Sequence, residues 1–352
     1  MNNYRLSILK NESDDDHLMW VAACQKKEKA FTVIDMSRQD WMDAVIKNRA
    51  DYYLAVPSGT VSYFKTMYDE RLYVLNKVLG LPVYPGFDEI VFHENKRMLS
   101  YWLMAHNLPH PQTNVFYKKN DALSFLTSTA FPVVAKTNIG ASGKGVKILK
   151  DKTAAIDYLN NALSGSGIQQ RTGPNLKMGR IFSRLVYSLK NPAHILKRIN
   201  IYHAISEDAQ KHFVIFQEFI PHDFEWRIVR IGSSFFGYKK MKIDDQCSGR
   251  KGYIYEPPPE DLLDFVKTLC DQYQLNCMAV DLFEDGRGGY LINEMQTAFG
   301  HVQDHICEKN GMPGRFIYSD DNWQFEPGMY NTNLSYDLRL ENVLEMLESN
   351  IV

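Results

Sequence analysis

The sequence has 352 residues, of which 40 are basic, 42 are acidic and 45% are apolar, and its net charge is -2. This composition is typical of a globular protein with enough chain for roughly two or three subdomains. The nearly neutral charge excludes bulk electrostatic attraction to nucleic acid. The first residues lack the apolar core of a signal peptide, and no apolar run approaches the length that spans a bilayer. The cysteines have no metal-ligand spacing, so we predict free thiols in a cytoplasmic protein.

The N-terminal region alternates between strand-like and helix-like segments. Three short β-branched or aromatic runs are strand-like: residues 4–10, 31–36 and 51–57. The segments between them have helical spacing of apolar residues, and a longer helical segment over 61–80 ends at Gly80. Alternating strands and helices favour a parallel sheet covered by helices. We therefore predict an α/β domain over residues 1–92.

A glycine-rich stretch, KTNIGASGKGV at residues 136–146, follows the apolar run FPVVA. It is not a P-loop, because Gly140 and the Gly143-Lys144 pair are too close for the G-x-x-x-x-G-K-[S/T] spacing. A P-loop also leads into a helix, whereas the β-branched GVKIL that follows here predicts a strand. We therefore predict a glycine-rich hairpin, with Lys136 at its base as a candidate phosphate ligand.

Residues 164–212 form a basic insert. From Gly167 to Lys211 the chain has eight Lys or Arg residues and only two acids. The simpler interpretation is an enlarged lid subdomain whose helices present a solvated cationic face. The alternative is docking of an anionic glycan, a pyrophosphate-linked lipid carrier or the inner membrane surface.

The strongest local pattern is NCMAVDLFE-DGRGG-YLINEMQ at residues 276–296. Two strand-like runs flank a turn rich in Gly and Asp, which predicts a hairpin. Glu294 and Gln296 share one face, and Asp281 lies opposite Asn293 or Glu294, depending on a possible one-residue bulge. These hard oxygen donors suit Mg²⁺. An acidic surface hairpin is the alternative, and the apolar residues around Asp281 disfavour it.

Charged residues also occur in the strand-like runs that follow the insert. Glu225 and Arg227 share one face of EWRIVRIG, where a structural salt bridge is the simpler interpretation. The cations of FFGYKKMK and SGRKG fit either a triphosphate clamp or a solvated sheet edge: Lys239, Lys240, Lys242, Arg250 and Lys251. Lys96, near the start of a helix predicted over 94–107, is a weaker candidate.

In their order along the chain, these motifs resemble the ATP-grasp superfamily, in the branch of the glutathione synthetases and the ribosomal-protein glutamate ligase. The shared features are the NK and NLPHPQT segments, PVVAK with its glycine loop, QEFI, E-W-R, and Asp281 followed by NEMQ. The chain is also similar to ATP-grasp proteins of bacterial surface-polysaccharide biosynthesis, in DWMDAVIKNRADYYLAVPSG, DERLYVLNKVLG, ENKRMLSYWLMAHNLPHPQT and EMQTAFG.

The resemblance implies an α/β (α+β) ATP-grasp fold. It implies a pre-ATP-grasp parallel α/β domain over 1–92, a central lid subdomain over 93–220 and a C-terminal subdomain over 221–352. ATP is expected between the last two. The expected cofactors are ATP and two Mg²⁺ ions, with Mn²⁺ as a possible substitute.

The resemblance also assigns roles to residues. The nucleotide-binding set that it implies is Lys96, Lys136, Gly140, Ser142, Gly143, Gly145, Glu218, Phe219, Glu225, Lys239 and Lys240. In this set Lys96 and Lys136 contact phosphates, the glycine loop covers the triphosphate, Glu218 and Phe219 meet adenine, and Glu225 is the ribose-side acid. The implied metal ligands are Asp281, Glu294 and Gln296.

The chain departs from the family pattern at two important positions. Gln296 stands where Asn is usual, which keeps an amide oxygen on a longer arm. Cys247 stands where the family has an arginine, and Arg250 is the candidate substitute that grips the phosphoryl group and the substrate carboxylate. Arg227 and Arg250 are therefore the candidate catalytic residues.

The resemblance implies a carboxylate–amine ligase that forms an acylphosphate and releases ADP and phosphate. A sugar acid or amino acid for surface glycans is the expected substrate class. The alternatives are a kinase with the same fold and a non-catalytic ATP-binding regulatory protein. Expected partners are a small carboxylate and an amine, with a glycan or lipid-linked sugar, peripheral contact with the inner membrane face and a homo-oligomer left open.

Overall fold

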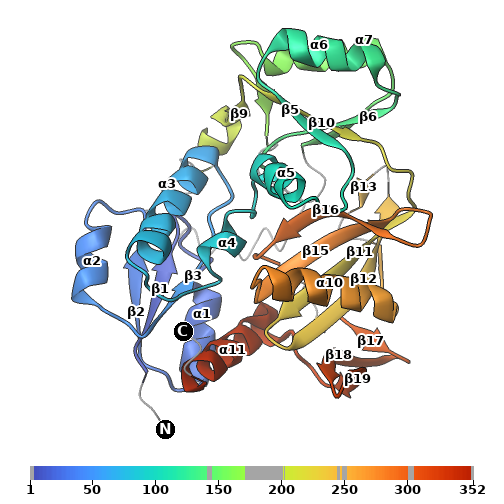
Figure 1. Cartoon of the computed structure of the whole chain (residues 1–352). Coiled ribbons are helices and arrows are strands. Elements are labelled where there is room, and N and C mark those ends of the chain that lie inside the picture. Colours follow the sequence, from blue (N-terminus) through green and yellow to red (C-terminus); the bar gives the residue numbers. More distant parts are fainter. Residues whose placement is uncertain are drawn as a thin grey trace, which may run out of the picture. The chain divides into compact units, whose positions relative to one another are not determined.

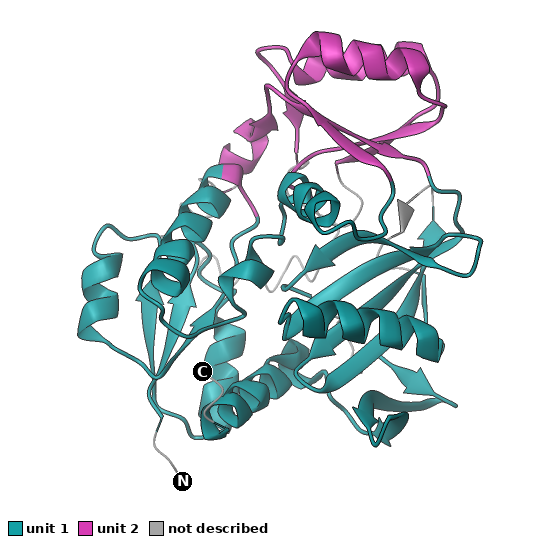
Figure 2. Cartoon of the chain, viewed as in Figure 1, with its two compact units in different colours: residues 1–59, 63–111, 220–352 teal, residues 60–62, 112–219 magenta. Residues whose placement is uncertain are grey.

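The computed structural model describes residues 4–140, 145–170, 201, 203–243, 246–247, 252–299 and 305–349 (Figure 1). Contacts divide the chain into two compact units (Figure 2). Unit 1 contains residues 1–59, 63–111 and 220–352, and unit 2 contains residues 60–62 and 112–219. The predicted boundary between residues 220 and 221 falls beside a unit boundary, whereas the one between 92 and 93 falls inside unit 1.

The N-terminal part of unit 1 is a parallel α/β layer, as the sequence predicts. Its sheet has the order β2-β1-β3-β4, and every neighbouring pair is parallel. The strands are β1 (Leu6–Lys10), β2 (Phe31–Asp35), β3 (Tyr52–Ala55) and β4 (Val83–Tyr84). The helices are α1 (Leu18–Lys26), α2 (Trp41–Lys47), α3 (Ser62–Tyr73), which a π-helical turn (Val74–Val78) extends, and the short α4 (Phe87–Ile90).

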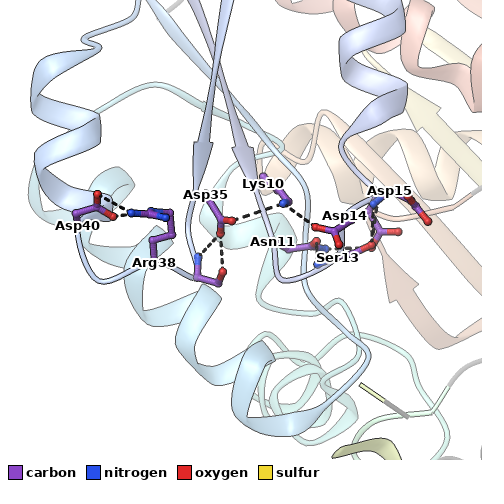
Figure 3. A network of polar contacts seen from close by, with 10 residues as sticks. Lys10, Asn11, Ser13, Asp14, Asp15, Asp35, Arg38 and Asp40 are labelled. Atoms are coloured by element: carbon purple, nitrogen blue, oxygen red, sulfur yellow. Dashed lines mark hydrogen bonds and ion pairs between the residues drawn. The ribbon is translucent and has the colours of Figure 1, made fainter. Parts of the chain in front are cut away.

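Polar contacts hold the carboxyl ends of these parallel strands. The hydroxyl of the buried Tyr68 donates to the carbonyl of Leu9 at the end of β1 and accepts from the backbone N–H of Val56 after β3. Figure 3 shows Lys10 between Asp14 and Asp35, with Nζ–Oδ distances of 3.0 and 3.5 Å. The side chain of an α3 residue and a lysine flanked by two acids thus fix this edge of the sheet.

The second layer of unit 1 is an antiparallel sheet with the order β16-β15-β11-β12-β18-β17. Its central strands are β11 (Phe224–Ile231), β12 (Ser234–Ile243), β15 (Cys277–Glu284) and β16 (Tyr290–Gln296). The peripheral strands are β13 (Gln246–Cys247), β14 (Tyr253–Ile254), β17 (Glu308–Lys309), β18 (Met312–Ser319) and β19 (Asn322–Pro327). The helices are α5 (Lys96–Ala105), α10 (Glu260–Gln272), a 3-10 turn (Thr332–Ser335) and α11 (Tyr336–Glu348).

The two faces of this sheet differ in chemistry. Helix α10 covers the apolar face (Figure 1), where its Leu262 and Val266 belong to the same buried core as Trp226 and Leu282. Side chains alternate along a strand, so the neighbours of these residues point to the other face. That face carries the charged residues of the candidate site.

Unit 2 is a smaller antiparallel sheet with the order β5-β10-β6-β7. Its strands are β5 (Thr113–Phe116), β6 (Val133–Lys136), β7 (Val146–Leu149) and β10 (Val214–Glu218). Helices α6 (Lys119–Ser128) and α7 (Lys152–Ala162) pack on one side of it (Figure 1). A separate ladder joins β8 (Ile168–Gln169) to β9 (Ala209–Gln210). Within the residues described in both units, no helix combines the length and apolar character needed to cross a bilayer.

Candidate active site

One face of the large sheet in unit 1 gathers the charged residues that the sequence singles out. Strand pairing places Glu225 beside Lys240, Arg227 beside Asp281, and Asp281 beside Glu294. Cross-strand partners project from the same side of a sheet, so these residues share one face. The predicted hairpin is confirmed, and the irregularity that the sequence left open lies between Asp281 and Leu282, which sets Glu294 rather than Asn293 opposite Asp281.

Asp281 is the centre of this charged face. Its side chain is 1% exposed, and both its oxygens are engaged. The guanidinium of Arg227 donates from Nε to Oδ1 at 2.6 Å and from Nη2 to Oδ2 at 2.7 Å, while Lys240 Nζ donates to Oδ2 at 2.7 Å. A bidentate arginine and a lysine on one buried carboxylate form a strong charge-assisted arrangement.

Lys240 links Asp281 to a second acid. Its Nζ lies 2.5 Å from Oε2 of Glu225, and the other oxygen of Glu225 accepts a hydrogen bond from Nδ2 of Asn293 at 3.1 Å. The simpler interpretation of the sequence is a salt bridge between Glu225 and Arg227, but the structure does not pair these two residues with each other. Each pairs across the sheet with a residue of another strand instead.

The pKa values follow from burial and from these neighbours. Burial alone would raise the pKa of Asp281, but the positive charges of Arg227 and Lys240 and their hydrogen bonds hold it at about 2. Burial would likewise lower the pKa of Lys240 and of Arg227, and the carboxylates beside them raise both above their ordinary values. All three groups are thus charged at neutral pH.

Glu294 and Lys96 form the more accessible part of this face. Lys96 is the first residue of α5, which begins there because Asn95 accepts the backbone N–H of Met98. Its Nζ lies 3.3 Å from Oε1 of Glu294, with side-chain exposures of 12% and 31%. Gln296 lies two residues further along β16, on the same face as Glu294.

Lys239 lies on the other face of the sheet from Lys240. It pairs with Trp226 in register, and its Nζ lies 4.5 and 4.8 Å from the ring centroids of Phe224 and Trp226. The same Nζ also forms an ion pair with Glu256 at 2.7 Å. The structure therefore does not bring the two consecutive lysines together, because neighbours in a strand alternate.

In unit 2, Lys136 ends β6 and is buried, with Val146 of β7 and Ile215 of β10 as its strand neighbours. The predicted hairpin is confirmed, since β6 and β7 pair antiparallel on either side of the glycine-rich loop. Gly140 is buried. Gly145 has a φ of +85°, and a Cβ there would lie 2.0 Å from Oγ1 of Thr137, so only glycine fits.

Glu218 and Phe219 lie at the end of β10. Glu218 is exposed, and its Oε2 accepts a hydrogen bond from the backbone N–H of Gln112 at 3.3 Å. Its own N–H donates to the carbonyl of Gln112 at 2.8 Å. These contacts fix the end of the strand where the sequence predicts adenine contacts.

No family model matches the chain. Over 81 residues it is 30% identical to the alpha-aminoadipate–LysW ligase LysX of Saccharolobus solfataricus. That match covers 23% of this chain and only 30% of the relative, so the chain matches less than a third of that protein's length.

Solved structures match over most of the chain. A RimK domain protein ATP-grasp from Sphaerobacter thermophilus has a TM-score of 0.50 and 14% identity, covering 83% of this chain and 90% of that one. The D-alanine–D-alanine ligase of Bacillus anthracis has a TM-score of 0.50 and 15% identity, covering 98% and 97%. The biotin carboxylase domain of the Hydrogenobacter thermophilus 2-oxoglutarate carboxylase, solved with MgADP, has 0.52 and 10%, covering 86% and 66%. The chain has the ATP-grasp fold.

Several residues that the ATP-grasp resemblance singles out lie outside the described residues. They are Ser142, Gly143 and Arg250, together with most of the basic insert at 171–200. At Cys247 only the backbone is described, in the short strand β13 that pairs with β12. Their roles stay predictions.

The donor set for an ATP-grasp metal can be tested by its chemistry. Asp281, Glu294 and Gln296 present carboxylate and amide oxygens on one sheet face, the hard donors that Mg²⁺ prefers. Within the described ranges, however, no three His, Cys, Asp or Glu side chains come together so as to hold a metal ion by themselves. Both oxygens of Asp281 accept from Arg227 and Lys240, so the partly exposed Glu294 and Gln296 offer the accessible oxygens. This pair fits a Mg²⁺ ion that takes one carboxylate and completes its shell with phosphate oxygens and water.

Two buried glutamines at the glycine-rich loop were not predicted from the sequence. Gln170 and Gln210 accept hydrogen bonds from the backbone N–H groups of Ile139 and Asn138, at 3.0 and 2.6 Å. A single neutral amide carries no sequence pattern, and the two lie far apart in the chain. Only the pairing of β8 with β9 brings them to the loop.

Proposed function

We propose that the protein is an ATP- and Mg²⁺-dependent carboxylate–amine ligase that releases ADP. The observation that carries the proposal is the charged face of unit 1, where acids and cations lie side by side over four neighbouring strands of an ATP-grasp fold. Replacing a buried ion pair by apolar residues is often neutral or stabilising, so a sheet face that keeps this many charges is more typical of a binding site than of a packing surface. The sequence relative and one of the structural relatives are themselves ligases.

The proposed reaction has two steps. A carboxylate oxygen of the substrate attacks the γ-phosphorus of ATP, the bond to ADP breaks, and an acylphosphate forms. The amine nitrogen of the second substrate then attacks the acyl carbon, phosphate leaves, and the nitrogen loses a proton. Both steps develop negative charge on oxygens, which fixed cations and amide dipoles stabilise.

In this reaction the accessible residues of the charged face would meet the nucleotide. Lys96 is proposed to donate to phosphate oxygens, since its Nζ is held beside Glu294 at the exposed end of the face. Glu294 and Gln296 are the proposed holders of Mg²⁺, which when bound would neutralise charge on the phosphates. Asp281 would join them by exchanging a hydrogen bond to Arg227 or Lys240 for the ion. Arg227 and Lys240 are proposed to act through Asp281, which occupies both of them.

Unit 2 is proposed to supply the remaining nucleotide contacts. Lys136 and the backbone of the glycine-rich loop around Gly140 and Gly145 would bind phosphate oxygens. Glu218 and Phe219 would meet the adenine base. We do not include Lys239 among the proposed nucleotide-binding residues, because it lies on the face of the sheet opposite the charged face, in contact with Glu256 and Trp226.

The substrate class is proposed on the sequence resemblance alone. A sugar acid or an amino acid for surface glycans is the first carboxylate to test, with amino sugars and amino acids as amines. Two Mg²⁺ ions, Mn²⁺ as a substitute, and docking of a lipid-linked sugar at the basic insert belong to the same proposal.

The test is a screen of carboxylates against amines with MgATP, with ADP release as the readout and hydroxylamine as a trap. A ligase releases ADP only with a suitable carboxylate and yields a hydroxamate from the acylphosphate. ADP release without hydroxamate and with a phosphorylated hydroxyl would instead show a kinase. Tight MgATP binding with no turnover across the screen would favour the regulatory protein.

A matched pair of variants tests the proposed role of Lys96. Lys96→Met removes a cation from the charged face. Lys152→Met is the matched control, because Lys152 is likewise the first residue of a helix, α7, but lies outside the proposed site. Loss of a charged hydrogen bond to phosphate is expected to weaken ATP binding about tenfold or more in the first variant. Equal ATP affinity in the two variants would contradict the phosphate contact.

A further inference from the structure

At the start of the glycine-rich loop, neutral side chains hydrogen-bond both backbone N–H groups and a backbone carbonyl. The N–H of Asn138 donates to Oε1 of Gln210 at 2.6 Å, and the N–H of Ile139 donates to Oε1 of Gln170 at 3.0 Å. The hydroxyl of Thr137 donates to the carbonyl of Ile139 at 2.7 Å. Consecutive backbone groups are therefore satisfied within the protein before the loop reaches Gly140.

Both glutamines are buried and fixed. Their exposures are 4% for Gln170 and 3% for Gln210. Nε2 of Gln210 donates to the carbonyl of Phe213 at 3.3 Å, which orients the amide so that Oε1 faces the loop. A buried N–H that loses its only acceptor costs the desolvation of that group, so each amide oxygen matters to the loop.

The two glutamines come from the two ends of the basic insert. Gln210 belongs to β9, which pairs with β8 through Ile168, and the N–H of Gln170 donates to the carbonyl of Asp208 at 3.3 Å. This short ladder closes the base of the insert and sets both side chains against the loop. The base of the insert and the start of the glycine-rich loop are thus one hydrogen-bonded structure.

The other side of the loop is fixed as closely. The N–H of Thr137 donates to the carbonyl of Gly145 at 2.8 Å, and a Cβ on Gly145 would also approach the carbonyl of Gln170 to 3.3 Å. The N–H groups of Thr137, Asn138 and Ile139 are therefore all engaged within the protein.

We propose that Gln170 and Gln210 are positioning residues that hold the start of the glycine-rich loop, at Asn138 and Ile139, in place for nucleotide binding. The proposal rests on the function proposed above. It assigns the base of the insert a role in nucleotide binding, whatever the rest of the insert does. Neither glutamine touches the nucleotide, and both act through the backbone at Asn138 and Ile139.

The test compares nucleotides that differ in their phosphates. Gln170→Met and Gln210→Met keep the side-chain length but remove the acceptor. Calorimetry with Mg²⁺ would then measure binding of ADP and of adenosine to each purified variant. Because the loop is proposed to contact phosphates, each substitution should weaken ADP binding about tenfold, as loss of one buried hydrogen bond allows, and leave adenosine binding within about twofold.

Two controls separate positioning from a loss of structure. Gln217→Met changes another buried glutamine of the same unit, which donates to Oγ1 of Thr113 and does not touch the loop. It should leave both affinities unchanged. The second control is thermal unfolding, in which Gln170→Met and Gln210→Met should lose no more stability than Gln217→Met, which also loses one buried hydrogen bond.

The outcomes distinguish this proposal from the proposed function. ADP affinity that falls no further in Gln170→Met and Gln210→Met than in Gln217→Met would overturn the positioning role, as would equal losses for ADP and adenosine. A wild-type protein that binds neither ATP nor ADP would overturn the proposed function itself. Faster amide exchange at residues 137–140 in both methionine variants, with wild-type exchange in Gln217→Met, would support the contacts independently of nucleotide.

Discussion

The charged face of unit 1 and the start of the glycine-rich loop in unit 2 hold their groups by opposite means. At the charged face, Asp281 is fixed by the full charges of Arg227 and Lys240. At the loop, Asn138 and Ile139 are fixed by the neutral amides of Gln210 and Gln170. A network of buried charges depends on every member, because removing one leaves the others uncompensated, whereas neutral hydrogen bonds fail one at a time.

This difference between the two regions matters for the proposed function. In the proposed function the charged face presents ions to a charged nucleotide, so its own charges must be balanced when no ligand is bound. The loop, by contrast, offers backbone groups, and neutral partners hold it without adding a field of their own. The two regions should therefore respond differently to loss of one partner, to acid and to added bulk.

The largest effect is expected from Asp281→Asn. This change leaves two buried cations facing a neutral amide, and removing one partner of a buried charge network typically costs about 3–5 kcal/mol of unfolding free energy. Asp285→Asn is the matched control, since Asp285 is exposed in the same hairpin and its Oδ1 accepts backbone N–H groups as an amide oxygen also can. Urea unfolding of both variants checks the prediction, and similar losses would remove the distinction between the two regions.

Acid should affect the charged face and spare the loop. The pKa of Asp281 is lowered to about 2 in the folded protein from 3.8, so its stabilising effect is full above the unfolded value and is lost as the pH falls through 2. A shift of this size is worth on the order of 2 kcal/mol. The difference in unfolding free energy between the wild type and Asp281→Asn should therefore shrink between pH 4 and pH 2.

The loop supplies the comparison for that titration. The difference between the wild type and Gln210→Met should stay constant over the same range, because amides do not titrate. Unfolding curves for all three proteins at several pH values check both statements. A Gln210→Met difference that also shrinks in acid would show that the two regions are not held by different means.

Much of the architecture could be predicted from the sequence because the signals are local. Alternation of strand-like and helix-like runs indicates the parallel layer, and the Gly- and Asp-rich turn indicates the hairpin that carries Asp281 and Glu294. The C-terminal hairpin of β18 and β19 and helix α11 were not predicted. They complete the fold by packing onto the larger sheet and its core.

The partners within the site could not be predicted in the same way. Whether Asn293 or Glu294 faces Asp281 depends on one irregularity in strand pairing, which shifts the side chains by one residue. Glu225 and Arg227 share a face, but Glu225 pairs with a residue of the next strand, β12, and Arg227 with one of β15, 54 residues further along the chain. The two glutamines at the loop depend on the closure of a long insert, so no local pattern could indicate them.

The smallest effect is expected from adding a single methyl group at a glycine of the loop and at a glycine of the hairpin. Gly145→Ala and Gly286→Ala both place a side chain at positive φ, +85° and +72°, which costs about 1 kcal/mol in each case. At Gly286 nothing lies within 4 Å of the added Cβ, whereas at Gly145 that Cβ would lie 2.0 Å from Oγ1 of Thr137. The overlap should add about 1–2 kcal/mol to the loss of unfolding free energy in Gly145→Ala alone.

That extra loss should also be visible in function, if the loop binds phosphates as proposed. To relieve the overlap, Thr137 must turn away from Gly145, which breaks its hydrogen bond to the carbonyl of Ile139 and loosens the segment that the two glutamines hold. Calorimetry with MgADP should therefore show weaker binding in Gly145→Ala and unchanged binding in Gly286→Ala. If Gly145→Ala lowered the free energy of unfolding but left the ADP affinity unchanged, the fixed start of the loop would serve the structure alone.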